Sequence, residues 1–456
     1  MRIRPGIPIS RARASSCRAW ARVRIRGRTM GPSCPGGCPT QGPGRRAHRS
    51  PAAGQSAAAP GEKYPWAYPV AVDGPPPIPQ TAPMASASPT APRHSPWTRP
   101  TLGPLSPRAL GLIFGLALPP LFWVSVHHGS TRALAEASPL SGLARLLGRG
   151  PGLPGTLQQI FELRLWRALT AAGVGAALAL SGALIQGLFQ NRLAAPSILG
   201  MTGGASLGAT LAILAVAGYS PALLLEAAHL SGAGLVPLCA FLGALAAAFL
   251  VERLATVRHH LSIPTLLLTG IALNTAIAGL LALILSWAVT EDLEVSRAIL
   301  RWSFGTLDGA APRGVATVWV GLALALAAAP FLAWELDLLQ AGEADARSLG
   351  VPTARVKRLA LCAAALSAAC AVCVAGQIAF LGLVIPHLVR LVAGGSHRTL
   401  LFLAPLAGAL FLLGTDTLQR WLLADEALAP GVLMSLIGGP FFLVLLWTRR
   451  REVESW

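Results

Sequence analysis

The sequence predicts an all-α integral membrane protein with about ten transmembrane helices, preceded by a disordered N-terminal tail. About ten apolar segments follow residue 108, and the chain is 53% hydrophobic with only 12% charged residues. Its mean hydropathy is +0.57. Soluble domains normally contain about 25% charged residues. The composition therefore excludes a soluble globular protein for most of the chain.

Residues 1–108 differ from the rest of the chain in charge and composition. Residues 1–100 hold 15 Lys and Arg against two acidic residues, in a chain whose net charge is +18. These cations are spread through Arg, Pro, Gly and Ser-rich sequence and form no basic face with interleaved aromatic residues, so we expect no nucleic-acid partner. Too little apolar surface is present to offset chain entropy, which predicts disorder.

Three origins of this tail stay open. Translation that begins at Met30, Met84 or nearby would make the tail a mis-assigned start. A genuine cytoplasmic tail would be attracted to anionic lipid. A transit peptide shares the Arg-rich and acid-poor composition, but the prolines disfavour the amphipathic helix that such a peptide forms.

The predicted transmembrane domain, residues 109–450, divides into apolar runs. A hydrocarbon core of about 30 Å needs roughly 20 helical residues per crossing. The predicted spans are 109–126, 163–189, 197–217, 235–254, 263–289, 313–334, 357–379, 381–394, 399–421 and 432–448. An even number of spans places both termini on one side, and the basic tail together with Arg449, Arg450 and Arg451 indicates the cytoplasmic side.

The seven cysteines form no convincing disulfide or metal framework. Cys370 and Cys373 have the spacing of a zinc or redox half-site, but no second pair of ligands accompanies them. We expect both thiols to pack as small apolar groups inside a helix.

Residues 376–398, GQIAFLGLVIPHLVRLVAGGSHR, set proline, histidine and arginine inside an apolar run. Such residues are rare in membrane helices, since a central arginine alone costs about 2.5–3.5 kcal/mol on insertion scales. GLVIPHLVRL followed by Gly-Ser-His-Arg resembles the permease subunits of ABC importers for iron-siderophores, haem and cobalamin, the FecCD family. The resemblance implies an inner-membrane permease that performs no covalent chemistry.

Three further blocks resemble the same family in the same order. They are LRLWRALTAAGVGAALALSGALIQGLFQNRLAAPSILGMTGGASLGA at 163–209, the polar stretch 338–351, and the region from LFLAPLAGALFLLGTDTLQRWLL to Pro-Gly-Val and Gly-Gly-Pro-Phe-Phe near the C-terminus. Arg192 and Ala195 depart from the proline and acidic residue that the family commonly has there. Together the blocks extend the resemblance over about residues 105–450.

Gly200, Gly204 and Gly208 recur every four residues. This spacing predicts a smooth ridge on one helix face, which lets a neighbouring helix backbone approach closely. Such ridges are general in membrane bundles, so packing without any part in transport remains an alternative.

The stretch between the sixth and seventh predicted spans, residues 336–356, is too polar to cross a membrane. Glu343 and Arg347 share one face of a predicted short helix that ends at a glycine. A solvated loop helix without a partner would fit the periodicity equally well. The resemblance implies instead a cytoplasmic coupling helix that rests in a groove of an ATP-binding subunit. Its predicted residues are Gly342, Glu343, Ala344, Arg347, Ser348, Leu349 and Gly350.

The chain lacks the Gly-Lys of a P-loop, because its only two lysines are Lys63 and Lys357, preceded by Glu62 and Val356. We therefore expect no cofactor on this chain, with ATP and Mg²⁺ held by a partner ATPase. The resemblance implies a second permease subunit, identical or closely homologous, two ATP-binding subunits, an external substrate-binding protein and membrane lipid as partners. It leaves open which metal chelate is carried.

Polar groups inside the predicted spans are few. Asp416 and Arg420 stand four residues apart and predict a local ion pair. Gln186 and Asn274 would face a pathway or bond between helices, and His387 would satisfy a carbonyl freed by Pro386 or take part in transport. Ion-coupled carriers usually need carboxylates near the bilayer midplane, and Asp416 is nearly the only candidate.

Trp302 and Phe304 lie in AILRWSFGTLDG, on a loop predicted to be external. The family has a short outer helix near this point that helps to close the exit of its pathway, which makes both residues candidate outer-gate residues. The sequence thus favours an ABC importer permease. An ion-coupled secondary transporter is the alternative, and an intramembrane enzyme is disfavoured because no span contains a catalytic motif.

Overall fold

A computed structural model describes residues 106–127, 140, 144, 155–219, 234–257, 260–423 and 428–448. The predicted tail and the Arg triplet 449–451 therefore lie outside the described residues, apart from residues 106–108. Within the described part the chain is helical, with one small hairpin in which β1 pairs antiparallel with β2. The prediction of an all-α membrane fold is confirmed.

Thirteen α-helices, one 3-10 helix and two short strands make up the described part. The first half comprises α1 Pro107–His127, α3 Gly155–Leu188, η3 Pro196–Leu199, α4 Met201–Tyr219, α6 Leu235–Ala255, β1 Thr256–Val257, β2 His260–Leu261 and α7 Ile263–Glu291. The second half comprises α8 Leu293–Ser303, α9 Pro312–Ala327, α10 Ala329–Leu339, α11 Glu343–Ser348, α12 Thr353–Ala375, α13 Leu381–Ala393, α14 His397–Leu423 and α15 Pro430–Thr448.

Every one of the predicted spans overlaps a helix, but the helices differ in length. Six are long and apolar enough to cross a membrane, and the pair α9 and α10, bent by 54°, would make a seventh in the described part. The apolar parts of α4, α13 and α15 are shorter. The 13 residues of α13 rise only about 20 Å, less than a hydrocarbon core of about 30 Å.

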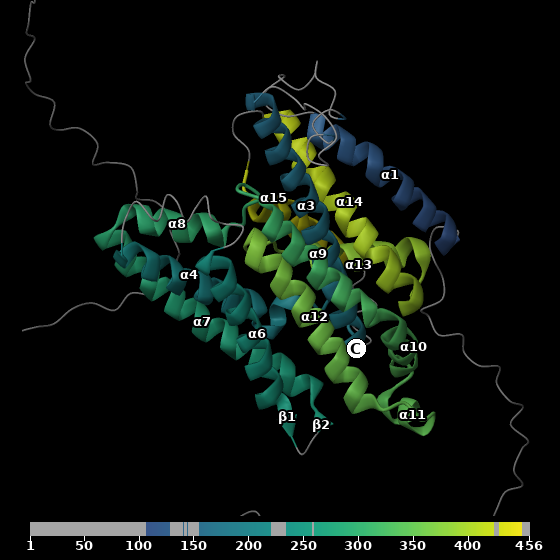
Figure 1. The fold of residues 1–456 in the computed structure, drawn as a ribbon. Coiled ribbons are helices and arrows are strands. Elements are labelled where there is room, and N and C mark those ends of the chain that lie inside the picture. Colours follow the sequence, from purple (N-terminus) through teal and green to yellow (C-terminus); the bar gives the residue numbers. More distant parts are fainter. Residues whose placement is uncertain are drawn as a thin grey trace, which may run out of the picture. The chain divides into compact units, whose positions relative to one another are not determined.

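The centre of the bundle is α3, whose apolar window is 94% buried in the protein. It packs against α9, α12, α13 and α14, while α1 lies outside α14 (Figure 1). Small residues make this packing possible: a Cβ on Gly175 would overlap the backbone of Gly408, and a Cβ on Gly182 would overlap that of Gly382. Close backbone contact of this kind holds helices together where lipid gives no hydrophobic drive.

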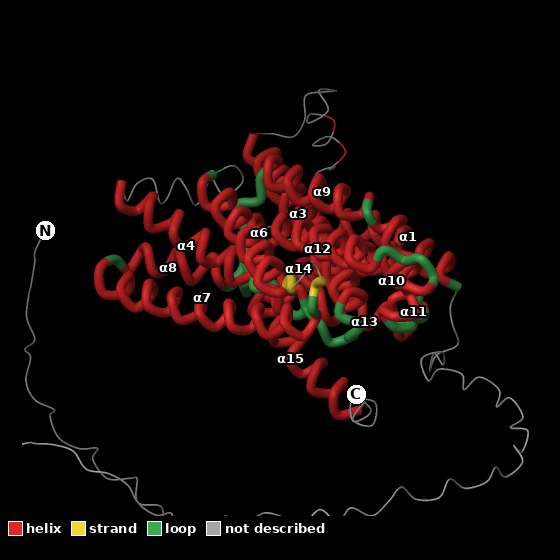
Figure 2. The backbone as a smooth tube through the Cα atoms, turned by 90° about the horizontal axis from the view of Figure 1, so that it is seen from below, coloured by secondary structure: helices red, strands yellow, loops and turns green. Residues whose placement is uncertain are grey.

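The two ends of the bundle differ. Figure 1 shows the hairpin β1–β2 and the short helix α11 at one end, with α8 lying across the bundle far from them. A second view from below places α7 and α8 on the opposite side of the bundle from α10 and α11 (Figure 2). We call the end with α11 and the hairpin the α11 end, and the region around α8 the α8 end.

Candidate functional site

Two breaks in helical structure meet inside the bundle. The first is η3, which ends at Gly200 in the left-handed conformation, with φ +78°. The second is the segment 376–380 between α12 and α13, where Gly376 has φ +68° and Phe380 has φ +63°. Glycine adopts such angles without strain, whereas a bulky residue such as Phe380 does so rarely. Gly438 of α15 provides the space for the Phe380 ring, since a Cβ there would overlap it.

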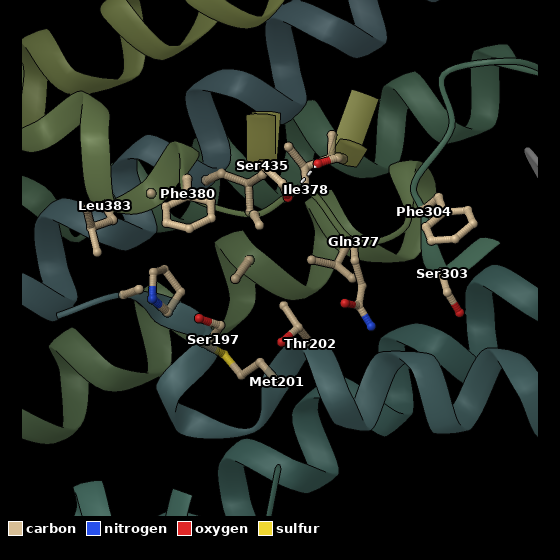
Figure 3. Close-up of a pocket in the computed structure, with 18 of the residues that line it drawn as sticks. Ser197, Met201, Thr202, Ser303, Phe304, Gln377, Ile378, Phe380, Leu383 and Ser435 are labelled. Carbon is tan, nitrogen blue, oxygen red and sulfur yellow. Dashed lines mark hydrogen bonds between the residues drawn. The ribbon is translucent and has the colours of Figure 1, made fainter. Parts of the chain in front are cut away.

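The breaks border a cavity of about 330 Å³ (Figure 3). Its walls combine apolar side chains with backbone that is not helical. Polar side chains also line it, namely Ser197, Thr202, Ser303, Gln377 and Ser435. Gln377 donates its amide to the Ser206 hydroxyl. Broken helices expose unpaired backbone groups at membrane depth only where protein or a cavity accommodates them.

The end of α8 is fastened to this cavity by backbone hydrogen bonds. The Thr306 N–H donates to the Ala375 carbonyl at 2.8 Å, and the Gly431 N–H donates to the Phe304 carbonyl at 3.1 Å. Phe304, one of the two candidate gate residues, lines the cavity. Trp302, the other, does not line it but packs, partly buried, against both apolar clusters. Displacement of α8 would therefore disturb the cavity wall.

The three polar residues proposed for a pathway lie outside the cavity lining. Gln186 is buried and donates to the Leu383 carbonyl at 3.1 Å. Asn274 of α7 donates to the Ser197 carbonyl at 2.8 Å, behind the cavity wall. His387 is buried within α13 next to Pro386. In this structure Gln186 and Asn274 bond between elements.

The predicted ridge divides between two neighbours. Gly204 and Gly208 of α4 lie against the α6 backbone, where a Cβ on either would overlap a carbonyl of Gly243 or Cys239. Gly200 lies outside α4, as the C-cap of η3, and faces Leu273 of α7. Gly200 takes a left-handed conformation before α4 begins, and a Cβ there would contact side chains, Leu273 of α7 and Ala247 of α6, and not a helix backbone.

The stretch 342–350 forms a separate surface element at the α11 end. Gly342, with φ +124°, precedes α11, and Gly350, with φ +85°, follows it. Ala346 is fully buried and anchors the helix. Ala344, Arg347, Ser348 and Leu349 are exposed, with 66% of Leu349 accessible.

Glu343 joins α11 to α12. Its carboxylate accepts from Arg347 Nη2 and from Lys357 Nζ, each at 2.6 Å. Partial burial opposes ionisation, but the hydrogen bonds and charges of Lys357 and Arg347 outweigh it and hold the pKa of Glu343 below its ordinary value. The Lys357 side chain is only 4% exposed, so Glu343 pairs a cation that the protein has removed from water.

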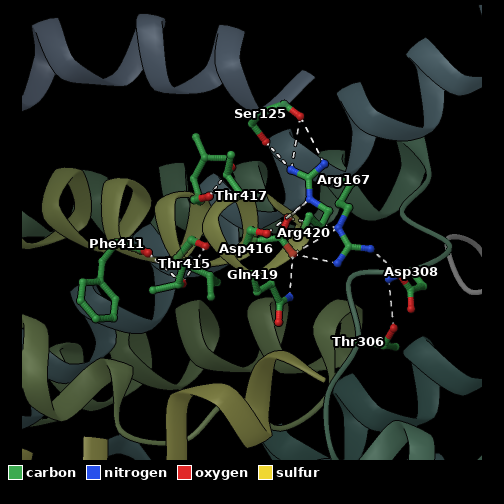
Figure 4. Close-up of polar contacts among 12 residues, drawn as sticks. Ser125, Arg167, Thr306, Asp308, Phe411, Thr415, Asp416, Thr417, Gln419 and Arg420 are labelled. Carbon is green, nitrogen blue, oxygen red and sulfur yellow. Dashed lines mark hydrogen bonds and ion pairs between the residues drawn. The ribbon is translucent and has the colours of Figure 1, made fainter. Parts of the chain in front are cut away.

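A polar cluster at the other end of α3 extends the predicted local ion pair. Arg420 Nε lies 3.1 Å from Asp416 Oδ2, which confirms that pair. Arg167 of α3 also binds Asp416, and it reaches Asp308 in the loop between α8 and α9 (Figure 4). The sequence analysis did not identify Arg167 or Asp308. The one available signal was that charged residues are rare in membrane spans and usually pair, which suggests a partner for Arg167 but does not say which residue it is.

No group of three or more His, Cys, Asp or Glu side chains in the described part is arranged to hold a metal ion. Cys370 and Cys373 are buried in α12 as free thiols. Their side chains are almost fully buried, as is common for thiols that pack as small apolar groups.

Residues 135–448 match the model of the FecCD transport family. The cobalamin import system permease protein BtuC of Halobacterium salinarum is 38% identical over 371 residues, covering 78% of this chain and 92% of that protein. The hemin transport system permease protein HmuU of Yersinia pestis is 40% identical over 295 residues, covering 64% and 84%.

A solved structure of a metal-chelate type ABC transporter in an inward-facing conformation is similar to the computed structure. Its TM-score is 0.61 with 29% identity, and the match covers 75% of this chain and 99% of that one. The family match spans more than half of the chain and the structural match extends over the bundle. The chain therefore belongs to the FecCD transport family and is a multi-pass membrane permease of the ABC importer type.

Proposed function

We propose that this permease pairs with a second permease subunit, identical or closely homologous, to enclose a pathway at their interface. Two cytoplasmic ATP-binding subunits would drive it, with ATP and Mg²⁺ bound on those subunits and none on this chain. An external binding protein would deliver the cargo. Family membership carries this proposal over the ion-coupled carrier, in which transport would need no ATPase.

The stretch 342–350 is the proposed contact with an ATP-binding subunit. It is held to the bundle by buried Ala346 and by the ion pairs of Glu343, while Leu349 extends from it with 66% of its surface exposed. An exposed apolar side chain on a short, firmly anchored helix suits insertion into a groove of another protein. This is the single observation that carries the coupling role.

The same assignment orients the protein. If α11 faces cytoplasmic ATP-binding subunits, the α11 end is cytoplasmic and α8 lies at the outer face. Both chain termini would then be cytoplasmic, as expected from an even number of spans. Closure of the ATPase would push on 342–350 and bias the bundle between inward-open and outward-open states.

The proposed cargo is a metal chelate of the cobalamin, haem or ferric-siderophore type. Two relatives carry names for cobalamin and hemin import, and the similar solved transporter is described as metal-chelate type. Uptake of each compound by vesicles that contain the assembled complex, with and without ATP, separates the three classes. Uptake of none of them would reject this cargo class.

The coupling role is tested with the full chain and its partner ATPase in membranes. Leu349→Glu places a charge on the exposed tip without altering buried contacts, so we expect co-purification of the ATPase or coupled ATP hydrolysis to be lost. Gly350→Pro should do the same, because proline cannot adopt the positive φ of Gly350.

Arg358→Gln is the matched control. Arg358 is exposed on α12 near the same end of the bundle but outside the stretch 342–350. We expect normal co-purification and normal ATP hydrolysis for this variant. Equal behaviour of Leu349→Glu and Arg358→Gln would reject the contact, and transport driven by an ion gradient without the ATPase would reject the ABC mechanism.

A further inference from the structure

A second, larger hollow lies on the flank of the bundle, away from the cavity at the helix breaks. Its volume is about 850 Å³, and it is bordered by α6, α9 and α12. Both α6 and α9 pack against α12 but make no comparable contact with each other, which leaves a groove between them. We refer to it as the α6/α9 groove.

Small residues keep the α6/α9 groove open. Gly314, Thr317 and Gly321 of α9 line it, and a Cβ on Gly321 would overlap Cys370 Sγ on its floor. Residues at these spacings share one face of a helix. A longer side chain at Thr317, which is exposed, would enter the space that is now empty.

The rims of the groove are apolar and exposed. Leu238 of α6 is 54% exposed, and Val320 and Leu324 of α9 are each 58% exposed. In a membrane span such side chains face lipid. The groove is therefore open sideways toward the hydrocarbon of the bilayer.

A cation marks one end of this apolar groove. Arg313, at the start of α9, lines the groove and is exposed, and no acidic partner is found for its side chain among the described residues. Arg313 is the second residue of α9, at the end of that helix opposite to the one that leads into α10 and α11. An unpaired guanidinium at the membrane surface favours a phosphate, which it can bind through two parallel hydrogen bonds.

The depth of the groove agrees with one leaflet. From Arg313 to Leu324 the lining rises about 16 Å along α9, at about 1.5 Å per residue. This is close to half of a hydrocarbon core of about 30 Å. An acyl chain whose phosphate sits at Arg313 would thus lie along the whole groove and end near the bilayer centre.

We propose that the α6/α9 groove binds one phospholipid, with its phosphate on Arg313 and an acyl chain over Gly321 and Cys370. The observations that carry this are the sideways opening, the leaflet depth and the charge at its surface end. The proposal does not depend on ATP-driven transport. It concerns a structural lipid of the leaflet on the α8 side.

Native mass spectrometry of the full chain in detergent, titrated with phosphatidylglycerol, tests the site. We expect one tightly retained lipid per chain. Arg313→Gln should weaken its retention by about tenfold, as expected for loss of a charged hydrogen-bonding partner. Thr317→Phe should abolish retention by filling the groove. Arg297→Gln is the matched control, since Arg297 is exposed on α8, paired with Glu294 and absent from the groove.

Size-exclusion chromatography checks that each variant is folded. If Thr317→Phe aggregates, Thr317→Leu takes its place. Retention that is equal in the unsubstituted chain, Arg313→Gln and Thr317→Phe would overturn the proposal. Cross-linking from a Thr317→Cys variant, in the presence of a lipid with a photoreactive acyl chain, gives a second test. Cross-links to residues 220–233 in place of that lipid would also overturn the proposal. Cross-links from Thr317→Cys to that lipid, reduced when Arg313→Gln is present in the same chain, would support it.

Discussion

Arg167 and Asp416 meet between α3 and α14, although 249 positions separate them in the chain. Arg167 Nη2 lies 2.7 Å from Asp416 Oδ1 and its Nε lies 3.1 Å from Oδ2, so the guanidinium grips the carboxylate with two nitrogens. Asp416 also accepts from Arg420, which in turn donates to Ser125 of α1. One carboxylate that is 1% exposed therefore connects three helices.

Asp416→Asn should destabilise the protein strongly. The change leaves Arg167 and Arg420, with side chains 15% and 10% exposed, without the carboxylate that both share. Removing one partner of a buried ion pair typically costs about 3–5 kcal/mol. Denaturant unfolding of the purified chain in detergent micelles measures the loss. Asp308→Asn is the control, because Asp308 is 81% exposed and exposed pairs contribute about 0–1 kcal/mol; equal losses for both variants would contradict this account.

Gly182→Ala should separate α3 from α13. A Cβ at position 182 would overlap the carbonyl of Gly382, and neither backbone can rotate away as a side chain can. Overpacking of a well-packed core costs about 1–3 kcal/mol, so we expect a clear fall in the thermal midpoint measured in detergent. Gly115→Ala is the matched control, since nothing lies within 4 Å of a Cβ there. An unchanged midpoint for Gly182→Ala would show that the helices are less tightly packed than described.

Much of the fold follows from local sequence. Each predicted span overlaps a helix, because long apolar segments leave water as helices. The bend between α9 and α10 was not predicted, although Pro330 inside the run 313–334 was a signal of it. The break between α12 and α13 was also not predicted. Gly376 and Phe380 have positive φ angles there, and these depend on contacts with the end of α8 and with α15.

The candidate site was predictable only in parts. The stretch 342–350 was predictable because it is polar and lies between two apolar spans. Its short helix is determined by local signals, including the glycine that follows it. The cavity at the helix breaks brings together residues from η3, α8, α12 and α15 that are distant in sequence. Asn274 and Gln186 bond to backbone carbonyls of such distant segments, and no spacing rule identifies partners of this kind.

The attachment of α11 to α12 should weaken in acid. Partial burial acts against ionisation of Glu343, but its bonds to Lys357 and Arg347 lower the folded-state pKa below the ordinary 4.5. The unfolded segment then binds more protons than the folded one, so stability rises with pH across this range. The stabilisation that the ion pairs of Glu343 give to the α11 attachment is complete above about pH 4.5. It is lost as the pH falls through the lowered pKa of Glu343.

Hydrogen exchange of the amides in 343–349 at pH 6 and below pH 4 measures this effect, after correction for intrinsic exchange. We expect protection to fall at low pH in the unsubstituted chain, whereas Glu343→Gln should have low protection at both values. Asp345→Asn is the control, because Asp345 is exposed on the same helix and forms none of the ion pairs described at this end. Protection that rose as the pH fell would contradict a lowered pKa of Glu343 in the folded state.

Trp302 and Phe304 together should control leakage through the outer end of the assembled complex. Phe304 lines the cavity, half exposed, while Trp302 packs against both apolar clusters at the end of α8. Truncating a half-buried ring removes about 1 kcal/mol of apolar contact, so the double alanine variant should raise leakage by more than about tenfold. Efflux of preloaded substrate from vesicles without ATP measures it. Phe331→Ala is the control, since Phe331 is 70% exposed on α10 and should leave efflux unchanged. If the double variant showed normal efflux and normal basal ATP hydrolysis, α8 would fasten the cavity wall without gating it.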